Sequence, residues 1–167
     1  MRALIVFSIC FLLSQTAGLA QAKYSVVLDA YETAEKPSSP EPARLINQVM
    51  RDQFNKGNLV HVVERKNVAP GAKLEAAPYY VGAKIDGLSF LGTKPVRIAI
   101  IMDLTKFSSR ELMVVCEKTR QVEPQVIESS AKLTGAAFDN SEYGKALIEL
   151  SRDAVKTFEA KVANLKE

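Results

Sequence analysis

The sequence contains few of the residues from which catalytic and metal sites are built. Its 167 residues include two cysteines, one histidine and no tryptophan. A zinc site needs three or four ligands, and a lone histidine supplies only one base for a serine triad. That histidine, His61, stands between Val60 and Val62 with no second ligand at a suitable spacing. We therefore predict a structural or surface role for His61 and no catalytic residue, no bound metal and no cofactor.

Signatures of nucleotide binding are also missing. Residues 82–87 (GAKIDG) are followed neither by Gly-Lys-Ser/Thr nor by the strand, Gly-x-Gly and helix of a dinucleotide site. We interpret these glycines as bulges or edges of a strand. The serine pairs at 108–109 and 129–130 have no base beside them in the sequence. The sequence thus favours a protein that is not an enzyme.

A strong charge of one sign is absent as well. The chain has 22 basic and 19 acidic residues, a formal net charge of +3, and its charges are scattered. It contains no block of five or six basic residues of the kind that binds nucleic acid or an anionic membrane. Neither is predicted as a partner.

The N-terminus has the layout of a cleavable secretory signal. Arg2 precedes an apolar run from Ala3 to Leu13, and residues 20–22 (AQA) fit the small-x-small cleavage rule. The apolar run is shorter than the roughly 20 residues of a membrane-spanning helix. We predict a signal peptide over 1–22 and a single domain over 23–167, with no intrinsic transmembrane segment after cleavage.

The two cysteines argue against a lipid anchor and against a disulfide. Cys10 follows Ile9 inside the apolar run, so it is not placed like the acylated cysteine of a lipoprotein. We expect a soluble, periplasmic or secreted protein that is not lipidated. Cleavage leaves only Cys116, which alternates with Val115 in an apolar strand and is predicted to be a buried small hydrophobe.

Hydrophobic periodicity predicts five strands and two main helices. Alternation of apolar residues indicates strands over 23–30, 59–64, 79–90, 96–107 and 110–122, the last two forming a hairpin. Helical spacing indicates amphipathic helices over 43–54 and 141–165, whereas 32–42 and 123–140 show neither period. A right-handed crossover through the first helix would make its flanking strands parallel. The predicted fold class is α/β, a layered sandwich with a mixed sheet of about five strands.

Two details of this pattern identify side chains. The second helix has an apolar stripe that should face the sheet, with Lys156 and Glu159 at the surface; the stripe comprises Leu147, Leu150, Ala154, Phe158 and Val162. Tyr79 and Tyr80 must point to opposite faces of one strand. At least one of the two rings is therefore expected in the core, and the other is a candidate binding platform.

Four segments together resemble one known family. They are residues 45–54 (LINQVMRDQF), 57–65 (GNLVHVVER), 77–90 (APYYVGAKIDGLSF) and 141–146 (SEYGKA). The sequence resembles the CsgG family of bacterial envelope proteins, which includes the curli secretion channel and the HfaB holdfast proteins, and more distantly LpoB and PelC. The resemblance spans most of residues 24–165 and implies a CsgG-like periplasmic domain.

Departures from this family limit the function that the resemblance implies. The hairpin turn Phe107 to Arg110 replaces the family's usual acidic residue and Thr-Gly, and the lipidated cysteine is missing. The links 87–96 and 122–140 are too short for two membrane hairpins with strands of about 9 to 11 residues. We interpret the chain as a short form that does not itself build an outer-membrane channel.

The family implies a role through protein contacts. The leading hypothesis is a non-enzymatic periplasmic accessory or scaffold in the assembly or secretion of an envelope component, such as a curli-like fibre, holdfast or exopolysaccharide. Its partners would be envelope proteins or further copies of itself in a homo-oligomeric ring. Two alternatives stay open: a regulator that activates a cell-wall enzyme, as LpoB does, and a glycan- or ligand-binding module.

Overall fold

A computed structural model describes residues 24–32, 39–63, 78–86 and 95–165, so the predicted signal peptide lies outside the described residues. Strands and helices follow the predicted order, with two short helices added. The elements are β1 (Tyr24–Glu32), α1 (Glu41–Phe54), β2 (Val60–Val62), β3 (Tyr79–Asp86), β4 (Val96–Lys106), β5 (Glu111–Val122), α3 (Pro124–Ser130), α4 (Gly135–Asp139) and α5 (Glu142–Ala163).

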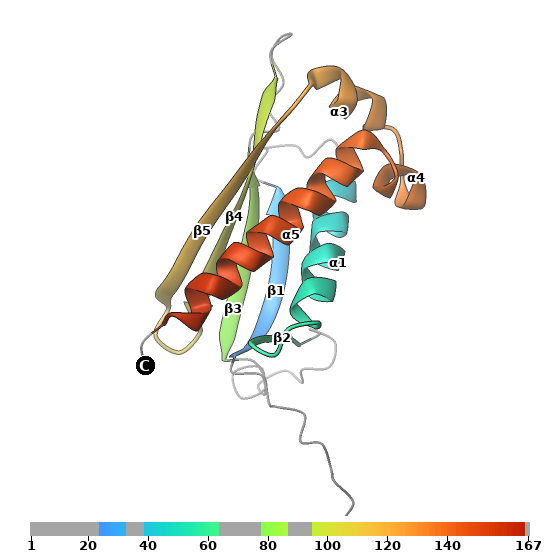
Figure 1. The fold of residues 1–167 in the computed structure, drawn as a ribbon. Helices are drawn as coiled ribbons and strands as arrows, with labels where there is room; N and C mark the ends of the chain where they lie inside the picture. The colour runs from blue at the N-terminus through green and yellow to red at the C-terminus, as the bar shows by residue number, and fades with distance from the viewer. Residues whose placement is uncertain (1–23, 33–38, 64–77, 87–94, 166–167) are drawn as a thin grey trace, which may run out of the picture.

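The strands form one mixed sheet in the order β2-β1-β3-β4-β5. β1 pairs in parallel with β2, which confirms the crossover prediction, and also in parallel with β3. β3, β4 and β5 are antiparallel neighbours. Together with the helices of Figure 1, this sheet confirms the predicted α/β sandwich.

Helices α1 and α5 lie side by side on one face of the sheet (Figure 1). The predicted stripe of α5 is buried along its length, from Leu147 to Val162. Phe54 of α1 and Phe158 of α5 are fully buried and meet edge to face, with ring centroids 5.8 Å apart. This geometry stabilises an aromatic pair beyond its buried area, so the two helices and the sheet share one core.

The start of α5 explains the short motif at 141–146. Ser141 caps the helix, because its Oγ accepts a hydrogen bond of 3.0 Å from the Gly144 N–H. Gly144 lies so close to the preceding turn that a β-carbon there would overlap the Phe138 carbonyl oxygen. Glycine is therefore required for close approach of α4 and α5.

The segment 123–140 contains two helices that periodicity does not predict. They have 7 and 5 residues, so neither is long enough to show the recurring apolar positions of a helix in the sequence. Pro124 begins α3, a position where its missing N–H costs nothing. Phe138 of α4 is buried against Tyr143, with ring centroids 5.8 Å apart. No helix in the described part of the chain has the length and apolar character of a membrane span.

The core role of α5 leads to a stability prediction. Phe158→Ala should lower the free energy of unfolding by about 3 to 5 kcal/mol, because it leaves a cavity between α1, α5 and the sheet. Lys156→Ala, on the exposed face of the same helix, should change it by less than about 0.5 kcal/mol. Urea melts of the purified protein measure both changes, and equal melts of the two variants would contradict this packing.

Candidate interaction surface

Residues that usually form catalytic or metal sites are dispersed. His61 is exposed on β2, where the register places it beside Ser25. Within the described residues, no three histidine, cysteine or acidic side chains are grouped as metal ligands. Ser129 and Ser130 both donate hydrogen bonds to the Val126 carbonyl of their own helix.

Cys116 is buried, as predicted. Its thiol lies 3.9 Å from the Ala154 carbonyl oxygen of α5, and only 2 % of the residue is exposed. Burial raises the pKa of the thiol, because the charged thiolate is poorly solvated there. A reactive thiol needs the opposite shift and access to solvent, so Cys116 is a packing residue.

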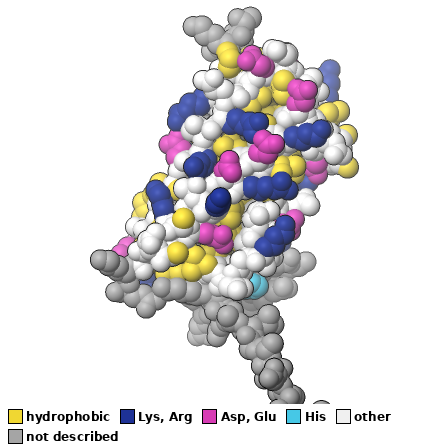
Figure 2. All heavy atoms as spheres, in the orientation of Figure 1, with side chains coloured by type: hydrophobic (Ala, Val, Ile, Leu, Met, Phe, Trp, Pro, Cys, Tyr) yellow, Lys and Arg dark blue, Asp and Glu magenta, His cyan; other side chains and the backbone are white. Residues whose placement is uncertain are grey.

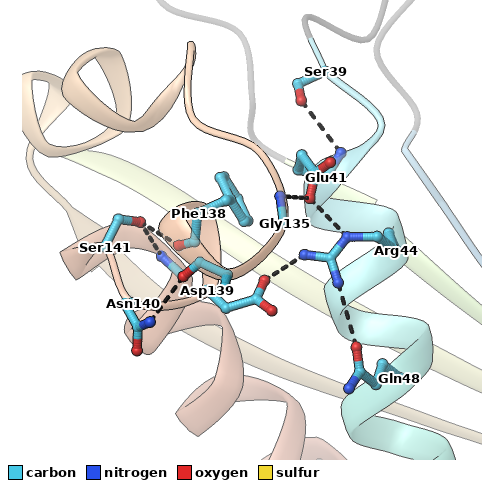
Figure 3. Close-up of polar contacts among 11 residues, drawn as sticks. Ser39, Glu41, Arg44, Gln48, Gly135, Phe138, Asp139, Asn140 and Ser141 are labelled. Carbon is cyan, nitrogen blue, oxygen red and sulfur yellow. Dashed lines mark hydrogen bonds and ion pairs between the residues drawn. The ribbon is translucent and has the colours of Figure 1, made fainter.

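The densest polar cluster joins α1 to α4 (Figure 3). Arg44 forms ion pairs with Glu41 of its own helix and with Asp139 of α4. Glu41 also accepts a hydrogen bond of 3.1 Å from the Gly135 N–H and is 8 % exposed. The ion pairs raise the pKa of Arg44, with the Asp139 hydrogen bond as the largest cause. Both carboxylates thus pair with the same guanidinium, and the cluster holds α4 against α1.

A second polar feature lies where α1 ends against α5. The carboxylate of Glu159, expected at the surface, is half-buried, and a β-carbon on Gly57 would lie 2.8 Å from its Oε1. This oxygen has no hydrogen-bond partner among the described residues, and burial raises the pKa of Glu159. Gly57 therefore serves to make room for a side chain of another helix.

The hollow beside Glu159 has about 410 Å³ of space and carries charges of both signs, with Lys56, Arg152 and Lys156 against Asp153 and Glu159. Figure 2 likewise shows basic and acidic side chains interleaved over this side of the molecule. A ligand of one charge would meet attraction and repulsion together. The hollow is not selective for either.

The opposite face of the sheet, which none of the described helices covers, has a different character (Figure 1). Strand register places two cross-strand rows there. One row is Tyr80, Thr105 and Leu112, and the other is Gly82, Asp103 and Val115. Neighbouring side chains in such rows touch.

Large apolar side chains are exposed on this open face. Phe107 is 38 % exposed, Leu112 57 % and Val115 45 %. Phe107 also packs against Tyr80, with ring centroids 6.0 Å apart. We name this region the open-face patch; it consists of Tyr80, Asp103, Thr105, Phe107, Leu112 and Val115. Exposed apolar side chains gathered on one face make that face a candidate interaction surface.

The patch settles which tyrosine belongs to the core. Tyr79 is on the helix-covered side and meets Tyr24 edge to face at 5.1 Å. Tyr80 points to the open face beside Phe107. Alternation along the strand predicts this division, and the patch shows that Tyr80 is the binding candidate.

Asp103 lies at the centre of the patch. Thr105 Oγ1 donates a hydrogen bond of 3.1 Å to its Oδ2. Burial raises the pKa of Asp103, and the bond from Thr105 lowers it by less. Its cross-strand neighbours are Gly82 and Val115, neither of which carries charge. Sequence alternation does not reveal this carboxylate as special, since an acidic residue on a strand is usually fully solvated.

Interpreting Gly82 as a bulge or edge is wrong. Gly82 lies in regular pairing on β3, the middle strand of the sheet. A β-carbon at this position would lie 2.5 Å from Asp103 Oδ1 and 3.2 Å from a ring carbon of Tyr80. The glycine instead provides the space in which the carboxylate and the ring converge.

Neither a protein-family model nor a curated protein sequence matches the chain. Its fold is similar to that of solved structures, among them the following three. Hypothetical protein CT253 from Chlamydia trachomatis has a TM-score of 0.57 and 13% identity, over 86% of this chain and 100% of that one. The PelC dodecamer from Paraburkholderia phytofirmans has a TM-score of 0.51 and 11% identity, over 84% of this chain and 90% of that one. Protein XCC0632 from Xanthomonas campestris has a TM-score of 0.50 and 11% identity, over 85% of this chain and 88% of that one.

At these identities the likeness shows a shared fold. It confirms the structural relation to PelC that the sequence suggested. Membership of the CsgG family and a link to curli stay predictions.

The contact between Gly82 and Asp103 can be tested by a double-mutant cycle. Gly82→Ala alone should destabilise the protein by about 1 to 3 kcal/mol, because the methyl group overpacks the site. In an Asp103→Ala background most of this cost should vanish, because the carboxylate that the methyl group would meet is gone. Alanine is also more stable than glycine in a strand interior, by about 0.5 to 1 kcal/mol. Urea melts of the four proteins give the coupling energy, and additive effects would contradict the contact.

Proposed function

We propose that the protein is a non-enzymatic accessory or scaffold of the bacterial cell envelope that works through protein contacts at the open-face patch. The observation that carries this proposal is the exposure of Phe107, Leu112 and Val115 on a sheet face that none of the described helices covers. Buried apolar area is the main driving force of protein association, and these side chains remain available for it.

Two further observations support the envelope setting. The N-terminus has the sequence layout of a secretory signal, and the fold is similar to that of PelC, whose crystal structure is a dodecamer. A homo-oligomeric ring and a heteromeric complex are both arrangements within this proposal. The component assembled would be a fibre, a holdfast or an exopolysaccharide.

Export without an acyl chain is the first test. The mature protein should begin at Lys23 and fractionate with the periplasm, because residues 20–22 form the cleavage site and Cys10 is not placed for acylation. Intact mass of the exported form measures this. A mass that includes diacylglycerol would contradict it.

Contact through the patch can be tested in intact cells. A photo-crosslinking amino acid at Leu112 should give covalent adducts with an envelope protein or a second copy, identified by mass spectrometry. The same residue at Arg152, exposed on α5, is the matched control and should give few adducts. If position 112 yields no adduct in a correctly exported protein, the proposed mode of action is wrong.

A further inference from the structure

We propose that the open-face patch docks a partner protein by receiving one of its arginine side chains at Asp103. This inference rests on the proposed function and specifies the chemistry of the occupant.

Asp103 is in no ion pair with any residue that the structure describes, although Lys84 lies one pair further along the same face of β3. In the part of the chain that the structure describes, no basic side chain forms an ion pair with it, and the bond from Thr105 comes from a neutral hydroxyl. A different carboxylate of the same face, Glu117, is neutralised by Arg97 at 2.6 Å. Glu117 thus has a basic partner on this face, whereas no such ion pair is found for Asp103 among the described residues.

The surroundings of Asp103 select the type of cation. Tyr80 places an aromatic ring near the carboxylate, and Phe107 packs against that ring. An arginine guanidinium both stacks on rings and donates parallel hydrogen bonds to a carboxylate. Leu112 and Val115 flank this position with exposed apolar surface. An arginine set between apolar side chains complements all of these groups at once.

Other occupants match less well. A metal ion would find one carboxylate, since no cluster of three ligands occurs among the described residues. Two copies joined about a two-fold axis through the patch would bring two Asp103 carboxylates together, and like charges across an interface are unfavourable. The charge of the patch thus favours a basic side chain of a different surface.

The test uses two blocked peptides that differ only in charge. Acetyl-Leu-Ser-Arg-Ser-Leu-amide places leucine, arginine and leucine on one side when extended, and its citrulline counterpart is neutral. Amide NMR shifts of the exported protein are followed during titration. The arginine peptide should shift the amides of Gly82, Asp103 and Val115 saturably, and the citrulline peptide should bind about tenfold more weakly.

Two matched variants locate the effect. Asp103→Asn should weaken the arginine peptide about tenfold and unfold at a higher urea concentration than wild type, because it removes a half-buried charge. If Asp103 served only to stabilise the fold, the Asp103→Asn variant would instead unfold at a lower urea concentration than wild type. Glu159→Gln removes the other half-buried carboxylate and should leave peptide binding unchanged.

Several results would overturn the proposal. They are equal binding of the two peptides, undiminished binding by Asp103→Asn, and shifts from neutral chitohexaose but not from the arginine peptide. Self-association in sedimentation velocity that Val115→Asp abolishes, without any peptide binding, would assign the patch to a second copy. Self-association of this kind would be compatible with the proposed function. The absence of crosslinked adducts from position 112 in cells would contradict the proposed function itself.

Discussion

Phe54 and Phe158 meet edge to face at 5.8 Å, fully buried between α1, α5 and the sheet. Both long helices are thereby committed to the same face, because each has only one apolar stripe and both stripes are used in this contact. With these helices on one side, none of the described helices covers the other side of the sheet. The open-face patch is therefore a consequence of how the core is built.

The parts of the fold that depend on periodicity could be predicted from the sequence. Strands and helices have long repeats, and the short link between α1 and β2 limits the crossover to a parallel pairing. Burial of Cys116 and the division between Tyr79 and Tyr80 follow from the two-residue repeat of a strand. Each of these conclusions needs only the order of residues along one element.

The parts that depend on contacts between distant elements could not be predicted. The sequence pattern suggests a bulge or an edge at Gly82. Yet Gly82 and Gly57 each give space to a carboxylate from another element, Asp103 and Glu159 respectively. The ion pair between Arg44 and Asp139 spans 95 positions. Nothing local to either residue indicates such a contact, since exposed and buried charges look alike in a sequence.

The half-buried position of Asp103 lowers the stability of the fold when its carboxylate is charged. Its folded pKa is raised by burial above the ordinary value of 3.8, so the folded state holds the proton at pH values where the unfolded chain has lost it. The contribution of Asp103 to the free energy of unfolding therefore falls as pH rises above that value, and it levels off once the pH has passed the raised folded pKa. Selection for stability alone would replace Asp103 by an uncharged residue or set a cation beside it. The presence of Asp103 in a site cleared by Gly82 and bordered by the Tyr80 ring is explained if a partner supplies the cation.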